Sequence, residues 1–323
     1  MELRTTELGT TGMQITRVGF GSWALGGGDW ASSWGPQDDV DSVRTVRHAV
    51  DAGVNWIDTA AVYGLGHSEE IVARALKDYA SADRPFVFTK GGLAWDPDDR
   101  RAGSRKIGDA ATLRRQVDES LSRLGVDRID LYFMHWPPAD GTPIEEYWAT
   151  LVDLRTSGKL RAIGLSNHGP EELSRAEHIG HVDVIQPPFS AIDPTAAEAV
   201  LPWCVEHRTG SVVYSPMGSG LLTGRFSRAR VDSLPEDDWR RRSSAFTTHL
   251  DANLATAAAV REVAERHATT SAAVAVAWTL GFAGVSAAIV GARTPAQVDD
   301  WLAAADLALT DQDYARISDR RPL

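Results

Sequence analysis

The chain contains very little cysteine: Cys204 is its one thiol among 323 residues. A single thiol excludes a disulfide within the chain and is typical of proteins from a reducing compartment. No apolar run reaches the roughly 18 residues that a membrane-spanning helix requires, and residues 1–21 lack the apolar core of a secretion signal. These absences predict a cytoplasmic protein.

Positive charge is also in deficit. Acidic residues outnumber Lys and Arg by 44 to 33, which gives a formal net charge of −11. A chain with this balance has no general attraction to nucleic acid or to an anionic membrane, so neither is an expected partner. Low-complexity stretches and obvious linkers are missing as well. We therefore predict one domain over residues 1–323, although this length would also accommodate two average domains.

The chain does contain a recurring unit, in which a short apolar strand is followed by a loop and an amphipathic helix. The expected strands are 17–22, 54–58, 86–90, 129–134, 161–165, 182–186, 211–215 and 286–290. The expected helices are 38–51, 68–79, 110–124, 144–157, 170–178, 195–207, 253–280 and 295–305. Strands that alternate with helices predict a parallel sheet, and eight of them favour a closed (β/α)8 TIM barrel.

Two segments lie outside this repeat. Residues 3–19 read as an N-terminal β-hairpin with a turn at Gly12, and residues 309–321 read as an extra amphipathic helix.

One glycine pattern suggests a different fold. Gly19-x-Gly21-x-x-Ala24 follows a strand and matches the dinucleotide-binding fingerprint. That fingerprint needs a helix to begin directly at the glycines, so that its N-terminus meets the pyrophosphate. Gly26–Gly28 and Gly35-Pro36 prevent a helix before residue 37. We therefore reject the Rossmann interpretation.

Chemistry in a (β/α)8 barrel collects at the C-terminal ends of the strands. Asp58, Lys90 and His135 stand at three expected strand ends, and Tyr63 lies on the loop after the second strand. Singly, each has an ordinary structural interpretation: a turn cap, a packed ring or a bond to a backbone carbonyl. Four such groups on adjacent strand ends favour an active site.

These four residues and their surroundings resemble the aldo-keto reductase family across nearly the whole chain, and the microbial and channel-subunit branch in particular. The motifs that carry the resemblance are NWIDTAAVYG, FVFTKGG, DLYFMHWPP, GKLRAIGLSNHGPEEL, VDVIQPPFS, VVYSPMGSGLLTG and AIVGARTPAQVDDWL. The resemblance implies a catalytic tetrad of Asp58, Tyr63, Lys90 and His135. Asp58 would hold Lys90, whose charge would lower the pKa of Tyr63 and make it a general acid. His135 would donate a second hydrogen bond to the substrate carbonyl.

The resemblance also implies a nicotinamide cofactor. Ser166, Asn167 and Gln186 would hold its carboxamide, and the ring of Tyr214 would stack on the nicotinamide. The other expected cofactor residues follow the seventh and eighth strands: Ser215, Pro216, Gly218, Gly220, Leu221, Gly291, Arg293, Gln297 and Asp300.

Arg293 is placed to meet a ribose 2′-phosphate, so NADP(H) is preferred over NAD(H). Relatives often carry a second Arg where Gln297 stands here, and an Asn that meets adenine where Trp301 stands. Dual use of the two cofactors therefore stays open.

The substrate end is less defined. Trp23 and Trp136 are expected to flank the carbonyl. Five further residues near the mouth have no assigned role, either on substrate or in loop packing: Trp30, Trp34, Trp95, His67 and His168. In the long loop 216–250, Arg225 or Arg228 would touch the pyrophosphate, and Arg240–Arg242 are expected on a solvated surface.

The expected activity is NADPH-dependent reduction of an aldehyde or ketone to an alcohol, with no metal. Two alternatives remain: an NAD(P)-dependent sugar or polyol dehydrogenase, and a cofactor-holding sensor or binding subunit with little turnover. The sequence names neither the physiological substrate nor the oligomeric state.

Overall fold

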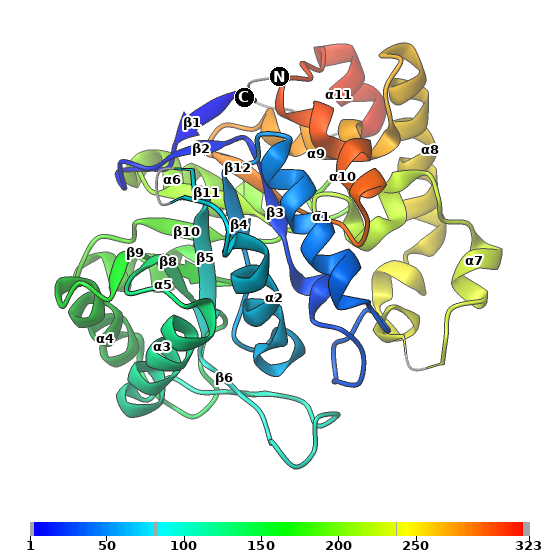
Figure 1. Ribbon diagram of the computed structural model, residues 1–323. Helices are drawn as coiled ribbons and strands as arrows, with labels where there is room; N and C mark the ends of the chain where they lie inside the picture. The colour runs from blue at the N-terminus through cyan, green and yellow to red at the C-terminus, as the bar shows by residue number, and fades with distance from the viewer. Residues whose placement is uncertain (1–2, 81–82, 237, 319–323) are drawn as a thin grey trace.

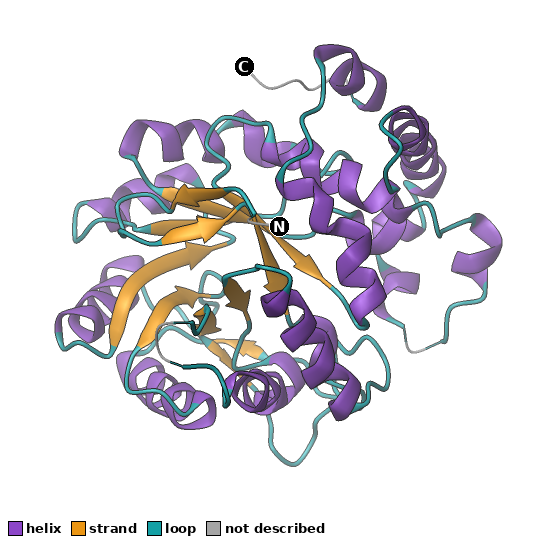
Figure 2. Cartoon of the chain, turned by 45° about the horizontal axis from the view of Figure 1, so that its top comes forward, coloured by secondary structure: helices purple, strands orange, loops and turns teal. Residues whose placement is uncertain are grey.

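The protein is an eight-stranded closed barrel surrounded by helices (Figures 1 and 2). The computed structural model describes residues 3–80, 83–236 and 238–318. The barrel strands are β3 (Val18–Gly21), β4 (Trp56–Asp58), β5 (Phe86–Gly91), β8 (Ile129–Met134), β9 (Leu160–Ser166), β10 (Val184–Gln186), β11 (Gly210–Val213) and β12 (Ala287–Gly291). All neighbours pair in parallel, and β12 closes the barrel on β3. The predicted (β/α)8 TIM barrel is therefore confirmed.

The helices lie outside the strands, and most of them pack their apolar faces against the barrel, whereas Val231 of the short helix α7 lies in a separate cluster with Leu221 and Phe246. They are α1 (Asp39–Asp51), α2 (His67–Leu76), α3 (Ala110–Leu124), α4 (Ile144–Thr156), α5 (Pro170–Glu177), α6 (Val200–His207), α7 (Arg228–Asp232), α8 (Leu250–Arg266), α9 (Ser271–Leu280), α10 (Pro295–Leu302) and α11 (Asp311–Ile317). α11 is the predicted extra helix at the C-terminus. Residues 319–321 of that prediction lie outside the described residues.

The expected helix 253–280 is wrong, because two helices occupy this stretch. Ala268 adopts a left-handed conformation with φ 50°, which a continuing helix does not allow. Thr270 then caps α9 by accepting a hydrogen bond from the Ala273 amide. The expected helix 195–207 is divided in a similar way, into a 3₁₀ helix over Thr195–Glu198 and α6.

Two hairpins stand outside the barrel sheet. The predicted N-terminal hairpin pairs β1 (Thr5–Glu7) with β2 (Gln14–Thr16), and its Leu8, Met13 and Ile15 pack with the apolar residues of the barrel interior. The second hairpin pairs β6 (Leu93–Ala94) with β7 (Arg105–Lys106), at the bottom of Figure 1. Sequence analysis did not predict this second hairpin.

The glycines of the rejected fingerprint serve packing inside the barrel. A Cβ added to Gly19 would overlap the indole ring of Trp56, which is buried and donates from Nε1 to the Thr16 carbonyl at 2.8 Å. A Cβ on Gly21 would lie 2.7 Å from Cγ2 of Ile289 on the neighbouring strand. These close approaches account for both glycines without a bound phosphate.

Among the described residues, no helix has the length and apolar character that crossing a membrane requires.

This packing predicts that Gly19→Ala destabilises the protein. Overpacking of a filled interior costs about 1–3 kcal/mol, because the indole or the strand must shift. Gly103→Ala is the matched control, since a Cβ there meets no atom within 4 Å. Denaturant unfolding of the two variants should show the loss for Gly19→Ala alone. Equal stability of both variants would mean that Gly19 has room for a side chain.

Candidate active site

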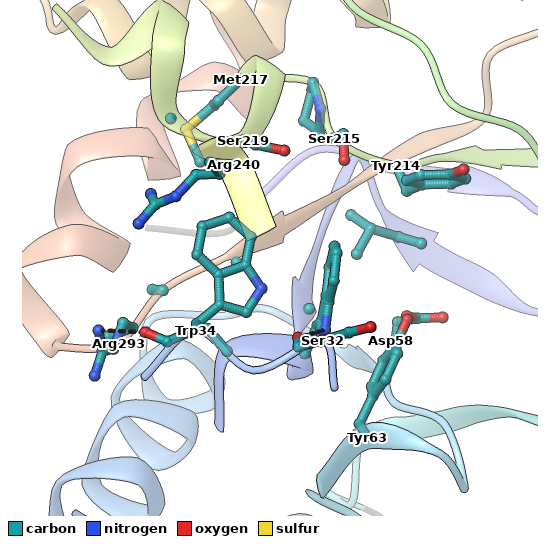
Figure 3. A pocket seen from close by; sticks show the side chains of 18 of the residues that line it. Ser32, Trp34, Asp58, Tyr63, Tyr214, Ser215, Met217, Ser219, Arg240 and Arg293 are labelled. Carbon is teal, nitrogen blue, oxygen red and sulfur yellow. Dashed lines mark hydrogen bonds between the residues drawn. The ribbon is translucent and has the colours of Figure 1, made fainter. Parts of the chain in front are cut away.

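A cavity of about 850 Å³ opens at the C-terminal ends of the barrel strands. This volume lies toward the upper end of the range for small-molecule sites. Figure 3 shows Asp58, Tyr63 and Tyr214 at one end, and Arg240 and Arg293 at the other. The cavity therefore combines a compact polar cluster with a separate cationic region.

The centre of the polar cluster is a buried ion pair. Lys90 Nζ, on β5, donates to Asp58 Oδ2 on β4 at 2.6 Å and to the Thr59 carbonyl at 2.8 Å. The amide of Gln186, on β10, donates to the other Asp58 oxygen at 2.9 Å. Burial raises the pKa of Asp58 and lowers the pKa of Lys90, while their mutual attraction acts in the opposite direction on both. Each charge is thus held by the other.

Tyr63 stands beside this pair. Its hydroxyl lies 3.4 Å from Lys90 Nζ, and its ring stacks on Trp23 with centroids 6.0 Å apart. The chain reaches this position through a tight turn in which Gly64 has φ 61° and packs directly on the backbone of Gly26. A side chain at Gly64 would collide there, so the turn requires glycine.

The expectation that Lys90 lowers the pKa of Tyr63 is wrong for the protein alone. Burial, followed by the negative charge of Asp58, raises the pKa of Tyr63 well above its ordinary value. The phenol is therefore protonated at neutral pH.

His135 completes the polar cluster. Its ring meets the Tyr63 ring edge-on with centroids 5.8 Å apart. Burial, followed by the charges of Lys90 and Lys106, lowers the pKa of His135 well below its ordinary value, so the imidazole is neutral. Nδ1 is buried and has no hydrogen-bond partner within the described parts of the chain.

The residues expected at a carboxamide lie next to the ion pair and bond to one another. Ser166 Oγ donates to the Gln186 carbonyl at 2.9 Å, and Asn167 donates to the His135 carbonyl at 2.9 Å. Tyr214 donates its hydroxyl proton to Asn167 Oδ1 at 2.7 Å. All four side chains line the cavity, so the structure brings this predicted group together.

The segment after β11 is built from left-handed residues. Ser215, Gly218, Ser219 and Gly220 have φ between 54° and 98°. The amides of Gly218 and Gly220 donate within this loop, to the Ser215 carbonyl at 2.8 Å and to the Met217 carbonyl at 3.1 Å. Ser215, Pro216 and Gly220 line the cavity, whereas Gly218 does not. The side chain of Leu221 is buried in an apolar cluster with Phe246, so it is not available to a cofactor.

Arg293 lies at the far end of the cavity, but its guanidinium is already engaged. It donates to the Trp34 carbonyl at 3.2 Å, to the Pro36 carbonyl and to the Gln37 side chain at 2.8 Å (Figure 3). Arg293 therefore also fastens the loop after β3.

The other expected cofactor residues at and after β12 share this end of the cavity. Gly291, Gln297 and Asp300 line it, and Asp300 pairs with Arg225 at 2.5 Å. Trp301 is buried in the main core, which limits what it offers an adenine to the cavity-facing edge of its ring.

The two tryptophans expected near the carbonyl both line the cavity. Trp23 stacks on Tyr63 and on Trp239, whose centroid is 5.6 Å away, and Trp136 follows His135 directly. Trp30 and Trp34 also line the cavity, whereas Trp95 packs on the loop cluster around Leu93.

His67 and His168, for which the sequence assigns no role, both have hydrogen-bond partners within the protein. His168 is buried and bonds to Tyr147 and the Ser166 carbonyl, and His67 bonds to Asp39 at 2.8 Å. His168 therefore has no free group to offer a substrate.

Sequence analysis missed several cavity residues. Arg240 was expected on a solvated surface, but it lines the cavity, pairs with Asp238 at 2.6 Å and lies over the Trp34 ring at 4.9 Å. Lys106 and Arg230 line the cavity too, and Arg228 does not. The run of arginines at 240–242 carries no periodicity that distinguishes the inward member from its neighbours.

The family model for the Aldo/keto reductase family matches residues 17–320, and the chain belongs to this family. It is an NAD(P)H-dependent oxidoreductase of the aldo-keto reductase class.

Three relatives illustrate the likeness. The chain is 34% identical over 300 residues to Aldo-keto reductase YhdN from Bacillus subtilis (strain 168), covering 91% of this chain and 86% of that protein. It is 33% identical over 326 residues to the NADH-specific methylglyoxal reductase of Escherichia coli (strain K12), covering 96% of each. The structure of a glycerol dehydrogenase from Gluconobacter oxydans has a TM-score of 0.87 and 36% identity, covering 97% of this chain and 93% of that one.

The buried ion pair predicts a strong coupling in stability. Asp58→Asn and Lys90→Met should each lower the free energy of unfolding by about 3–5 kcal/mol, because each leaves an uncompensated buried charge. The double variant should lose less than the sum of the two, since no lone charge remains. Denaturant unfolding measures all three.

The control for this cycle is Asp153→Asn, which breaks the exposed pair with Arg114 and should cost under about 1 kcal/mol. Additive losses at Asp58 and Lys90 would contradict the coupling.

Proposed function

We propose that the protein reduces an aldehyde or ketone to an alcohol with NADPH, and that Tyr63 is the general acid. The observation that carries this proposal is the placement of the Tyr63 hydroxyl 3.4 Å from a buried lysine that Asp58 holds at 2.6 Å. Residues 1–323 would form one aldo-keto reductase domain, which the match over residues 17–320 supports.

The cavity suits a nicotinamide dinucleotide. When bound, the cofactor supplies a hydride to the substrate carbon. Ser166, Asn167 and Gln186 offer amide and hydroxyl groups of the kind a carboxamide bonds, and the Tyr214 ring faces the same end. The phosphates would be held by the arginines at the other end, namely Arg225, Arg230, Arg240 and Arg293.

The protein's own part is the proton. Tyr63 is protonated at neutral pH and lies at the cavity wall, so it can donate to the carbonyl oxygen as charge develops there. Lys90 then stabilises the phenolate, which the buried site would otherwise disfavour. Neutral His135 offers the N–H of its ring as a second hydrogen bond to the same oxygen, and its lowered pKa makes it a poor acceptor for the proton of Tyr63.

NADP(H) is the preferred cofactor in this proposal. Four arginines line the far end; Arg225 pairs with Asp300 and Arg240 pairs with Asp238, whereas Arg230 and Arg293 have no carboxylate partner among the described residues. A relative named as NADH-specific shows that the family also accommodates the other cofactor, and Asp300 is a group that could bond a ribose hydroxyl instead.

A second candidate is oxidation of a polyol with NAD(P), which the likeness to a glycerol dehydrogenase favours. The same residues would act in reverse, with Tyr63 accepting the proton. Initial rates in both directions, measured with a panel of carbonyls and polyols, distinguish the two.

Removal of the proton donor tests the assignment of Tyr63. Tyr63→Phe keeps the ring that stacks on Trp23 and removes only the hydroxyl, so carbonyl reduction should fall by roughly 10²–10⁴-fold. NADPH binding, followed by tryptophan fluorescence quenching, should persist. Turnover near the wild-type rate would reject Tyr63 as the acid.

Cofactor preference is tested at Arg293. A charge-assisted bond to a phosphate is worth about 1.5–3 kcal/mol, so Arg293→Ala should raise the dissociation constant of NADPH on the order of 10–100-fold. The constant for NADH should rise much less.

Gln37→Ala is the control for this prediction, because it loosens the same loop and leaves the cation in place. It should weaken both cofactors by a similar factor. If Arg293→Ala does the same, Arg293 only anchors the loop and the preference for NADPH loses its main support.

A further inference from the structure

Lys106 is a cation at the catalytic end of the cavity for which the described residues provide no counter-charge. It lies on β7, it lines the cavity, and its Nζ sits 4.2 Å from the centroid of the Trp136 ring. Its ammonium makes no hydrogen bond or ion pair within residues 3–80, 83–236 and 238–318. Its side chain is half-buried, so water only partly replaces such a partner.

The carboxylates that line the described cavity are both occupied elsewhere. Asp58 is held by Lys90, and Asp300 is paired with Arg225. Lys106 therefore contributes a net positive charge to the part of the cavity where a substrate would lie.

The position of Lys106 places this charge near the reacting groups. In the hairpin register Lys106 pairs with Leu93, which packs in one cluster with Val62, Tyr63 and Trp136. Its charge also acts on His135, the residue directly before Trp136. An apolar wall thus connects the Tyr63 hydroxyl to the ammonium of Lys106.

The arginines at the other end of the cavity do not explain Lys106. Arg240 and Arg293 lie at the end opposite Tyr63 in Figure 3, where the phosphates of a cofactor would be held. Lys106, at the catalytic end, is therefore available to a ligand other than the cofactor phosphates.

From this juxtaposition we propose that the substrate is a carbonyl compound that carries a carboxylate, with an apolar or aromatic spacer between the two groups. The carbonyl lies at Tyr63 and His135, the spacer lies against Leu93 and Trp136, and the carboxylate binds Lys106. This inference rests on the proposed function, and it adds a substrate class to it.

A matched pair of substrates tests the inference. 4-Carboxybenzaldehyde carries the anion, and methyl 4-formylbenzoate has the same ring and carbonyl without the charge. The ester withdraws more electron density from the aldehyde than the carboxylate does, so the informative quantity is the ratio of kcat/KM for the carboxylate to that for the ester. This ratio should fall on the order of tenfold from the wild type to Lys106→Met. Lys106→Arg should restore most of the ratio, and higher salt should reduce it in the wild type.

The control variant is Arg105→Met, which removes a neighbouring exposed cation on the same strand. Because successive strand residues point to opposite sides, Arg105 does not line the cavity, and its variant should keep the wild-type ratio. A ratio that Lys106→Met leaves unchanged, or lowers no more than Arg105→Met does, would overturn the inference while the proposed function stands.

A binding measurement separates the inference from the proposed function. Quenching of tryptophan fluorescence by the two product alcohols, 4-(hydroxymethyl)benzoate and its methyl ester, reports affinity without turnover. Tighter binding of the carboxylate that depends on Lys106 supports the inference even if neither aldehyde is reduced, an outcome that would reject the proposed reductase activity. Equal binding of the two alcohols would overturn the inference.

Discussion

The contact between Asp58 and Lys90 is the constraint on which the catalytic end depends. Two opposite charges are buried at the ends of adjacent strands, and neither is tolerable there without the other. The parallel register pairs Asp58 with Phe88, so Lys90 lies one repeat further along β5, above the Asp58 carboxylate. Gln186 on β10 and the Thr59 carbonyl satisfy further polar atoms of the pair, which links β4, β5 and β10 through a single cluster.

The rest of the barrel supports this cluster by keeping the other end closed. Large apolar side chains fill the interior, and the N-terminal hairpin covers the end of the barrel opposite the cavity with Leu8, Met13 and Ile15. Polar chemistry is thereby confined to the mouth. Within the mouth, arginines gather at one end, while an apolar wall and a buried phenol define the other. The reduction that we propose requires this separation, with an anionic cofactor at one end of the cavity and protonation of a carbonyl at the other.

Much of this arrangement could be predicted from the sequence, because buried strands are short apolar runs and barrel chemistry follows their ends. Asp58, Lys90 and His135 were found in this way. The break between α8 and α9 could not, since Ala268 gives no glycine or proline signal before its left-handed turn. The direction of the Tyr63 pKa was also missed, because the extent of its burial depends on residues far apart in the chain. The inward position of Arg240 and the hairpin that carries Lys106 could not be predicted either, because both depend on how the loops pack on residues far apart in the chain.

The central claim is that this cluster delivers a proton to a carbonyl while a nicotinamide delivers a hydride. The most direct measurement is a single turnover with NADPH that carries deuterium at both C4 positions, followed by mass spectrometry of the alcohol. The account predicts one deuterium at the carbinol carbon of the alcohol. An alcohol without deuterium at that carbon, or a bound NADPH that is never oxidised in the presence of any carbonyl, would contradict it.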